Sequence, residues 1–359
     1  MKVAVVYNLS HSDLEHYNKQ FSPKELDFEP YFDIESSNPL EGYYSIKNAL
    51  EKTGFESYCL NLFDDFNAFL ADYKVNSPDV VFNMVEIYKD KAYLEMSFAS
   101  LLEMMNIPYT GAPPLALGVC QRKILTKSIL SSLGIRTPRF QVVARMEELS
   151  DLHLNYPVIV KPSMEDASLG IEDESVVRDI QSLKDRVEYV LTHFKQHVLL
   201  EEFIDGRELN VAVLGDKNPR VLPISEIDFT EMPSHLNNIV SYQAKWDPFH
   251  EAYHMARPIC PAVLPAEVEQ EAKTLALNAF KALGCRDYAR VDMRLSKENK
   301  LFVLEANPNP DLTEDAGFMR SSRASGMSFR RTLKKIVELA WARRKERVKI
   351  KPACRGQEL

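Results

Sequence analysis

Two carboxylates, Asp292 and Glu305, stand on the two strands of one predicted β-hairpin. Residues 288–295 and 301–305 are apolar runs typical of strands, and the polar residues 297–300 are typical of the turn between them. With four residues in that turn, the two carboxylates lie directly opposite each other. Opposed residues share a face of the sheet, with Cβ atoms about 5 Å apart.

The same register places Arg290 opposite Asn307. Two carboxylates and an amide on an otherwise apolar hairpin are costly unless a cation lies between them. Their oxygens suit Mg²⁺, which usually takes one or two carboxylates together with the phosphates of a nucleotide. An ion pair of a carboxylate with Arg290 or Arg294 explains the hairpin equally well. The hairpin alone therefore leaves a magnesium site and a salt bridge as alternatives.

The composition is that of a soluble globular protein with two or three domains. The chain has 359 residues, of which 45% are hydrophobic and 27% charged, and its net charge of −8 argues against nucleic acid as the main partner. No apolar run approaches the roughly 18 residues of a membrane helix, and residues 2–7 read as a buried strand instead of a signal peptide. Five scattered cysteines without metal-ligand spacing indicate free thiols in a reducing cytoplasm.

The first predicted domain covers residues 1–117 and alternates strands with helices. Its polar stretch, roughly 9–40, is long for a connection and typical of a lid or a mobile segment. The predicted elements are a strand at 2–7, a helix at 43–53 ending at Gly54, strands at 56–60 and 78–83, and a helix that runs through Met104.

Two further predicted domains follow, a central one at 118–205 and a C-terminal one at 206–342. Residues 343–359 form a basic tail, for which a solvated terminus is a simpler explanation than contact with RNA or a membrane surface. The predicted helices are 119–133, 179–193, 266–283 and 328–342, and the predicted strands are 157–161, 198–200, 208–214, 219–224, 288–295 and 301–305.

Several polar residues of the central domain fit a nucleotide. Lys161 ends a buried strand just before the loop 162–170, where a lysine reaches phosphate or solvent. The strand that ends at Glu201 continues into Phe203 and Ile204, which can offer backbone groups to an adenine edge. Glu208 is placed to bind ribose hydroxyls. Each of these residues, taken singly, also has a purely structural explanation.

Taken together, six ordered motifs resemble the ATP-grasp superfamily, and specifically its D-alanine–D-alanine ligase-like branch. Their order and spacing hold over residues 107–342, while the first domain fits more loosely. The motifs are Ile107 to Gly111, Lys123, Lys161 to Gly170, Glu201 to Glu208, Tyr288 to Asp292, and Leu304 to Pro308.

The resemblance implies an α/β ATP-grasp fold, with an N-terminal Rossmann-like domain and two α+β subdomains that hold ATP between them. It also implies a reaction in which ATP phosphorylates a carboxylate and an amine displaces the phosphate. The roles carried over are Lys123, Lys161 and Ser168 for phosphates, Glu201, Phe203 and Ile204 for adenine, Glu208 for ribose, Asp292, Glu305 and Asn307 for Mg²⁺ (or Mn²⁺), Arg290 for the acyl phosphate, and Lys245 for the γ-phosphate.

The substrate-binding motifs depart from the family. The Gly-Gly-x-Ser-x-Glu stretch expected after the first strand is absent from residues 7–12. The family's Asn-Thr-x-Pro-Gly-Met-Thr segment becomes 307–313, with Asp311 in place of its glycine. A carboxylate at that place repels an acceptor carboxylate and attracts an amine. We therefore expect a carboxylate–amine ligase acting on small-molecule or peptide substrates other than two D-alanines.

Other functions remain open at this stage. They are a D-alanine–D-alanine ligase, a ligase of a thiol, a kinase-like enzyme, and a regulatory protein that binds ATP without turnover. Retention of Arg290 beside the acidic residues argues against the last. His235, His250 or His254 is either a base for the amine or an ordinary loop residue. The family's habit suggests a homodimer.

Overall fold

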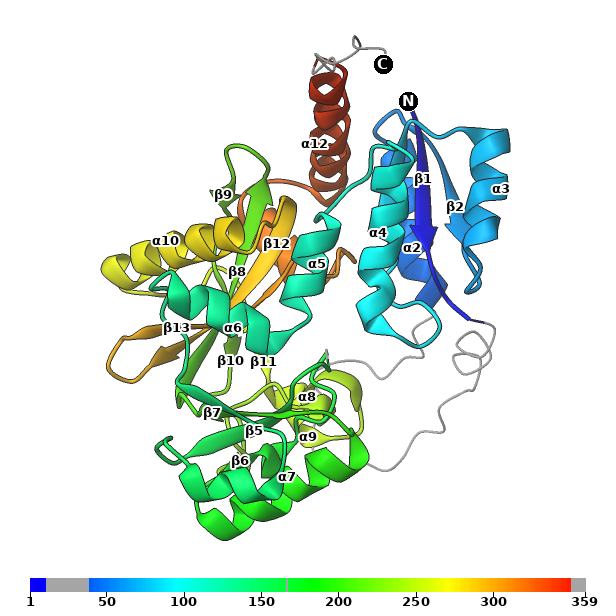
Figure 1. Ribbon diagram of the computed structural model, residues 1–359. Helices are drawn as coiled ribbons and strands as arrows, with labels where there is room; N and C mark the ends of the chain where they lie inside the picture. The colour runs from blue at the N-terminus through cyan, green and yellow to red at the C-terminus, as the bar shows by residue number, and fades with distance from the viewer. Residues whose placement is uncertain (11–38, 166, 350–359) are drawn as a thin grey trace, which may run out of the picture.

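The computed structural model describes residues 1–10, 39–165 and 167–349, which form three β-sheets (Figure 1). The first sheet is parallel, in the order β2-β1-β3. The strands β1 and β3 are largely apolar because helices cover both faces of the sheet, α2 and α12 (Phe329–Lys349) on one side and α3 and α4 on the other. Its elements are β1 (Lys2–Tyr7), α2 (Pro39–Glu51), β2 (Glu56–Asn61), α3 (Phe66–Asn76), β3 (Val80–Met84) and α4 (Glu95–Met104).

The second sheet is antiparallel, in the order β4-β7-β5-β6, and packs against α7. The apolar runs of the sequence predict its two central strands, but the short edge strands β4 and β6 carry too little pattern to be found. Its elements are β4 (Phe140–Val143), β5 (Val158–Pro162), β6 (Val176–Val177), α7 (Ile180–His193) and β7 (Val198–Glu202).

The third sheet runs β11-β10-β8-β12-β13, with β9 paired to β8. Alternation along β8 and β12 separates its faces. Leu209, Val211 and Val291 pack under α10, while Ala212 and Tyr288 pack under α11 and α12. The elements are β8 (Gly206–Gly215), β9 (Arg220–Val221), β10 (Ser225–Asp228), β11 (Arg257–Ile259), α10 (Ala266–Ala282), β12 (Asp287–Ser296), β13 (Leu301–Asn307), α11 (Gly317–Ala324) and α12 (Phe329–Lys349).

Several predicted boundaries are wrong. The helix predicted at 119–133 is two helices, α5 (Pro114–Cys120) and α6 (Lys123–Ser132), because Arg122 leaves the helical conformation. The strand predicted at 219–224 pairs only over β9. Segment 226–258 contains two short helices that the sequence does not reveal, α8 (Tyr242–Trp246) and α9 (Glu251–Met255). Most of the predicted lid at 9–40 lies outside the described residues.

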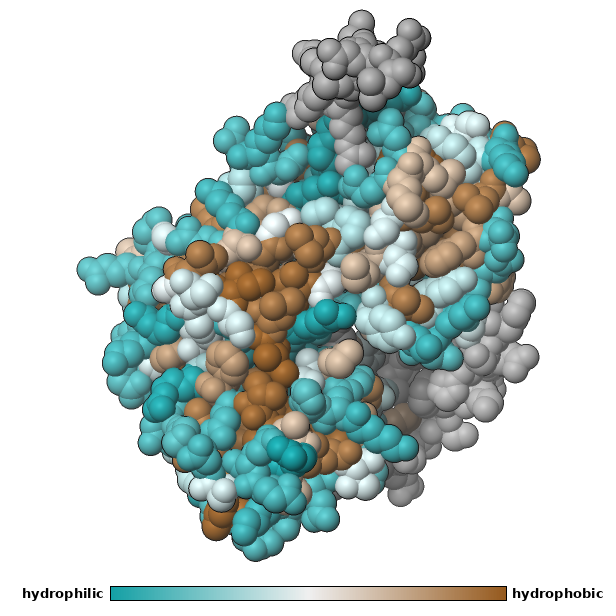
Figure 2. Space-filling model, viewed as in Figure 1, coloured by the Kyte–Doolittle hydropathy of each residue, from teal (hydrophilic) through white to brown (hydrophobic). Residues whose placement is uncertain are grey.

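Helices α5 and α6 leave an apolar band on the surface. Figure 2 shows it as a brown strip over these helices, where Leu115, Leu125 and Leu133 are exposed. Surface bands of this kind occur at protein interfaces. The predicted homodimer nevertheless stays a prediction. Within the part of the chain that the structure describes, none of the helices combines the length and the hydrophobicity that crossing a membrane requires.

The tail predicted from residue 343 is wrong at its first residues, because α12 continues to Lys349 and Arg343 is held inside the molecule. Its guanidinium forms an ion pair with the buried Asp287 at the start of β12, and it donates to the carbonyl of Tyr109 over 2.7 Å. Asp287 also accepts from the amide of Gly111 over 2.9 Å. This cluster joins the first domain to the third sheet and α12.

Arg343→Met is expected to lower the free energy of unfolding by about 2 kcal/mol, because it leaves a buried carboxylate with fewer charge-assisted partners. Urea unfolding of the full chain measures this. The matched control is Arg344→Met, one residue later. The guanidinium of Arg344 is exposed and lies 4.7 Å from the ring centroid of Trp341, so its loss is expected to lower the free energy of unfolding by less than about 1 kcal/mol. Equal losses for the two variants would show that the Arg343 cluster contributes no special stability.

Candidate active site

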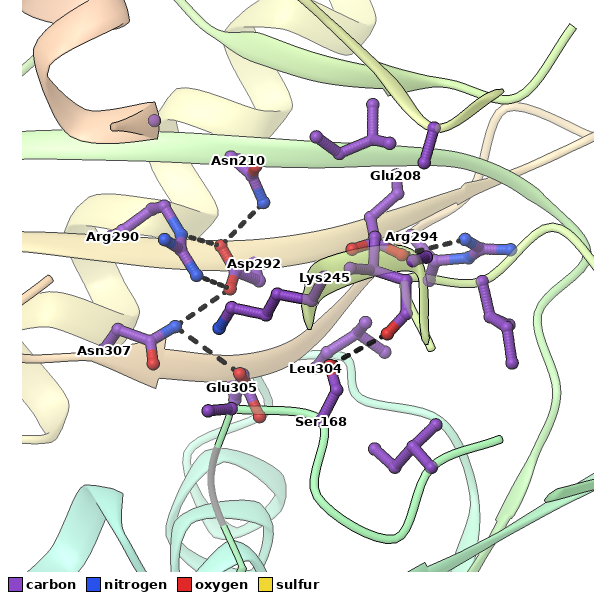
Figure 3. A pocket seen from close by; sticks show the side chains of 18 of the residues that line it. Ser168, Glu208, Asn210, Lys245, Arg290, Asp292, Arg294, Leu304, Glu305 and Asn307 are labelled. Carbon is purple, nitrogen blue, oxygen red and sulfur yellow. Dashed lines mark hydrogen bonds and ion pairs between the residues drawn. The ribbon is translucent and has the colours of Figure 1, made fainter. Parts of the chain in front are cut away.

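A cavity of about 430 Å³ lies between the second and third sheets (Figure 3). Strands β5 and β7 contribute one wall, and β8, β12 and β13 contribute the other. All predicted site residues except Lys123 line it: Lys161, Ser168, Glu201, Phe203, Ile204, Glu208, Lys245, Arg290, Asp292, Glu305, Asn307 and Asp311.

The hairpin register is confirmed at the site, although by a different route. Asp292 pairs with Glu305, and Arg290 pairs with Asn307. The connection between β12 and β13 has the predicted four residues, 297–300. Next to it, however, Met293 pairs with Val303 and Leu295 pairs with Leu301, which is one residue out of the predicted register. A β-bulge at Leu304 restores the register. Without this extra residue Asp292 would face Leu304, and Glu305 would point away from the cavity.

The Asp292 carboxylate accepts four hydrogen bonds. Arg290 donates two, both over 2.7 Å, and the amides of Asn210 and Asn307 each donate over 2.9 Å. The salt bridge that the sequence left open is therefore present in the structure. Glu305 differs, because no lysine or arginine among the described residues forms an ion pair with it, and it accepts a long hydrogen bond from the Asn307 amide over 3.4 Å. One of the two carboxylates thus remains available to a cation.

Cations surround Glu305 without touching it. Burial raises the pKa of Glu305, but nearby cations, above all Lys123 and Lys161, outweigh burial and hold that pKa below its usual value. Lys245 extends from α8 toward the same space (Figure 3). Lys123 lies outside the cavity lining and donates to the carbonyl of Glu165 in the predicted phosphate loop. The cavity therefore combines ionised carboxylates with ammonium groups, as binding of a metal–polyphosphate requires.

The predicted adenine end is partly occupied by contacts within the protein. The Phe203 amide donates to the carbonyl of Pro157 over 2.8 Å, and the Ile204 carbonyl accepts from Arg294 over 3.0 Å. Among these backbone groups the Phe203 carbonyl and the Ile204 amide remain, one acceptor and one donor, which suits an adenine edge. Glu208 forms an ion pair with Arg294 over 3.1 Å, so ribose binding there competes with a guanidinium.

Two loops meet over the cavity. Ser168 donates to the carbonyl of Val240 over 2.8 Å, and the Trp246 indole donates to the carbonyl of Ala167 over 2.8 Å. Both Ala167 and Ser168 have positive φ angles, which non-glycine residues adopt only when surrounding contacts hold them there. The predicted phosphate loop is thus anchored to the segment that carries Lys245.

Comparison with known proteins agrees with this geometry. A family model described as the D-ala D-ala ligase C-terminus matches residues 129–338. The chain belongs to the D-alanine–D-alanine ligase family. It is an ADP-forming ATP-grasp ligase of the type that makes carbon–nitrogen bonds.

Two relatives and one solved structure illustrate the similarity. The chain is 32% identical over 308 residues to an uncharacterized protein, y4sG, of Sinorhizobium fredii, covering 83% of this chain and 87% of that protein. It is 36% identical over 247 residues to the D-alanine–D-alanine ligase of Desulforudis audaxviator, covering 68% and 76%. A crystal structure of the Bacillus anthracis D-alanine–D-alanine ligase complexed with ATP has the same fold, with a TM-score of 0.70, 23% identity, and coverage of 97% and 99%.

The three histidines of the ligase segment 226–258 do not line the cavity. His235 pairs with Glu251 over 2.8 Å, and His250 accepts from the Ala252 amide at the start of α9. His254 is fully buried and contacts the Pro248 carbonyl. Their contacts within the loop agree with ordinary loop residues and provide no base aimed at an incoming amine.

Sequence reasoning gave no role in the site of this ligase to Asn210, Lys127 and Arg320, and it named Arg294 only as a possible ion-pair partner of a hairpin carboxylate. Asn210 and Arg294 carried a usable signal, because each lies two residues from a predicted site residue on the same strand and therefore on the same face. Lys127 is buried against Glu201, and Arg320 lines the cavity from α11. Nothing in the sequence connects α11 with the hairpin, so Arg320 could not be found.

Proposed function

We propose that this chain is an ATP- and Mg²⁺-dependent carboxylate–amine ligase that forms an amide bond through an acyl phosphate, with substrates other than two D-alanines. The observation that supports the substrate difference is Asp311, whose carboxylate lines the same cavity as Arg290 and the acidic hairpin residues. Its oxygens accept from the amide and hydroxyl of Thr313 over 2.8 and 2.9 Å. These contacts fix the orientation of the side chain.

The donor set suits the metal. Two carboxylates and one amide oxygen, on Asp292, Glu305 and Asn307, are the hard ligands that Mg²⁺ takes when nucleotide phosphates complete its shell. Among the described residues, no group of three or more His, Cys, Asp or Glu side chains offers a different cation site. When bound, the ion supplies charge neutralisation to the phosphates during transfer.

Different residues of the chain have different roles in this reaction. Lys161 and Lys245 bind the phosphates and hold the γ-phosphoryl group in line with the attacking carboxylate oxygen, while ADP is the leaving group. Arg290 stabilises the negative charge that develops when the amine attacks the acyl carbon and phosphate departs. Asp311 attracts the amine as its ammonium ion to this end of the cavity. The two loops joined through Ser168 exclude water from the acyl phosphate.

The second candidate is ligation of two D-alanines, which the name of the Desulforudis audaxviator relative favours. The two candidate functions are distinguished by measuring phosphate release from ATP in the presence of Mg²⁺ and of amino acids, dipeptides, polyamines or cysteine. Stimulation by one acid–amine pair supports the proposal, and stimulation by D-alanine alone would contradict the substrate difference.

Asp311→Asn is expected to raise KM for the amine substrate about tenfold, because it removes one charge attraction at the cavity wall, while KM for ATP stays the same. The matched control is Asp315→Asn, whose carboxylate lies on the same connection, is 97% exposed and is absent from the cavity lining. Equal KM values for wild type and Asp311→Asn would remove Asp311 from amine binding.

A further inference from the structure

Arg186 is a buried cation on α7 that lies outside the cavity. It is 7% exposed and is not among the residues that line the cavity. Its Nη1 donates to the Glu172 carboxylate over 2.7 Å, and its Nη2 donates to the backbone carbonyl of Gly170 over 2.9 Å. Gly170 ends the predicted phosphate loop, and Glu172 follows it. The guanidinium therefore ties the end of this loop to α7.

The packing of α7 on the second sheet comes from apolar residues and not from this arginine. Leu183, Val187 and Val190 of the helix are fully buried in one apolar cluster with the sheet. Among the described residues the hydrogen bonds of Arg186 reach only the segment 170–172, and its buried Nε has no partner. A buried ion pair with an unsatisfied donor is commonly less stabilising than a well-packed apolar side chain. What Arg186 adds is a fixed conformation of the segment 170–172.

Gly170 holds the same end of the loop close to its neighbours. Its φ is +75°, and a Cβ there would lie 2.6 Å from Cγ of Pro162 and 2.7 Å from Cζ of Phe194. The backbone can therefore lie against the end of β5 and the residue after α7 only because the side chain is absent. Two residues earlier, Ser168 has a φ of +63°, and its carbonyl accepts from the Ile171 amide over 2.9 Å. A shift of Gly170 would therefore also move Ser168.

The residue after the loop connects it to α8. The Ile171 carbonyl accepts from the amide of Tyr242, the first residue of α8, over 2.7 Å. Lys245 lies on the same short helix, and the indole of its neighbour Trp246 donates to the carbonyl of Ala167 over 2.8 Å. The end of the loop that Arg186 holds is therefore also the place where α8 is attached.

We infer that Arg186 is a positioning residue for the phosphate chain of ATP. Through its two contacts at the end of the loop, it holds Ser168 and Lys245 where both reach the phosphates. It does not itself touch the nucleotide, and the backbone groups that suit adenine lie on another connection, between β7 and β8. The inference rests on the proposed function, in which the phosphates of ATP occupy this part of the cavity.

Two measurements on the full chain test the inference without requiring turnover. The chain has two tryptophans, so Trp341→Phe leaves Trp246 as the only indole, and it reports on the contact between α8 and the loop. In this background, Arg186→Met is expected to increase the quenching of Trp246 by acrylamide and to move its emission to longer wavelength. Calorimetry in Mg²⁺ is expected to show an affinity for ATP that is about tenfold weaker, because a displaced loop loses about one charge-assisted hydrogen bond to phosphate.

Lys184→Met is the matched control, because this exposed lysine lies on the same helix, two residues before Arg186. It should behave as wild type in both measurements. Arg186→Lys should recover part of the affinity for ATP, since an ammonium group can still donate to one of the two acceptors.

Glu172→Gln keeps the inference testable if Arg186→Met does not fold. The Glu172 side chain is 30% exposed, and glutamine keeps an acceptor for Arg186 while losing the charge. Both readouts should change in the same direction as for Arg186→Met and by a smaller factor. If Arg186→Met failed to fold and Glu172→Gln matched wild type, the role of Arg186 would be structural and the inference would be wrong.

The inference is also overturned by an unchanged affinity for ATP in Arg186→Met. A weaker affinity with unchanged Trp246 quenching would do the same, because the effect would then not pass through the loop and α8. Failure of wild type to bind ATP would overturn both the inference and the proposed function. Phosphate release with acid–amine pairs is measured separately. If the variants follow the expected pattern but no pair stimulates ATP turnover, the proposed function fails and the positioning role of Arg186 stands.

Discussion

Asp292→Asn is expected to lower the rate of ATP-dependent amide formation about a thousandfold, since a metal ligand at a transferring phosphoryl group contributes several kcal/mol to the barrier. The substitution replaces a carboxylate that is 6% exposed and accepts from Arg290, Asn210 and Asn307. It therefore removes a charge from the proposed metal site and also leaves Arg290 without its partner. The rate of phosphate release with the stimulating substrate pair measures the loss.

Glu305→Gln separates these two effects, because no arginine among the described residues forms an ion pair with Glu305. It should also slow turnover, while leaving the bidentate contact of Arg290 with Asp292 intact. The affinity for ATP, measured by calorimetry in Mg²⁺ and in EDTA, gives a second readout. In both variants the gain in affinity that Mg²⁺ provides should largely disappear, and binding in EDTA should change little.

The matched control is Glu298→Gln, in the turn of the same hairpin, where the exposed carboxylate accepts from the Ser296 hydroxyl and forms no ion pair with any residue that the structure describes. It should behave as wild type. If Asp292→Asn kept more than about a tenth of the wild-type rate and the full response to Mg²⁺, the carboxylate would serve only as the salt-bridge partner of Arg290. The hairpin would then need no metal.

The hairpin also shows what sequence patterns can and cannot give. Alternation fixes which residues share a face, so Asp292 and Glu305 are correctly paired from the sequence alone. The bulge at Leu304 is not revealed by alternation, because one extra residue in one strand changes the pairing without changing the sequence pattern of the partner strand. The predicted four-residue turn is correct, but the strands next to it pair one residue out of the predicted register, and the bulge compensates for this shift at the site.

Contacts between distant segments explain most of what the sequence did not reveal. Arg343 was assigned to a tail because seven cations follow one another closely, and only the fold brings it against Asp287. Lys123 shares a helix face with Lys127, yet it contacts Glu165 while Lys127 is buried against Glu201. Spacing along one helix cannot distinguish these partners, since each lies on another element.

Glu201→Gln is expected to lower the free energy of unfolding at pH 7 by about 3–5 kcal/mol, because it breaks a buried ion pair and leaves a buried cation without its partner. The carboxylate is 2% exposed and lies between two ammonium groups, 3.2 Å from Nζ of Lys127 and 2.8 Å from Nζ of Lys161. Among the described residues, the other contacts of Lys127, which is 1% exposed, are the Thr137 hydroxyl and the face of Phe140. Urea unfolding measures the loss.

The loss should depend on pH in a defined direction. Burial raises the pKa of Glu201, but the charges of Lys127 and Lys161 outweigh burial and lower it from 4.5 to about 2. Because the pKa of Glu201 is lower in the folded state than in the unfolded state, its ionised form stabilises the fold. This stabilisation is fully present at pH values above the pKa of the unfolded state, and it is lost as the pH falls through the pKa of the folded state. The stability difference between wild type and Glu201→Gln should therefore shrink between pH 4.5 and 2. A constant difference across this window would contradict the ion-pair explanation.

Glu202→Gln is the matched control, because the neighbouring carboxylate pairs with Arg139, whose side chain is 61% exposed, and a loss below about 1 kcal/mol is expected. Adding Lys127→Met to Glu201→Gln tests the cause of the larger loss. If an unpaired buried ammonium is responsible, the second substitution removes it and recovers part of the stability, so the two changes are not additive. A further loss on adding Lys127→Met would mean instead that Lys127 contributes mainly through packing. The Lys161 side chain is 12% exposed at the cavity wall and loses its carboxylate partner in the double variant. The affinity of the double variant for ATP therefore shows whether Glu201 is needed to position Lys161.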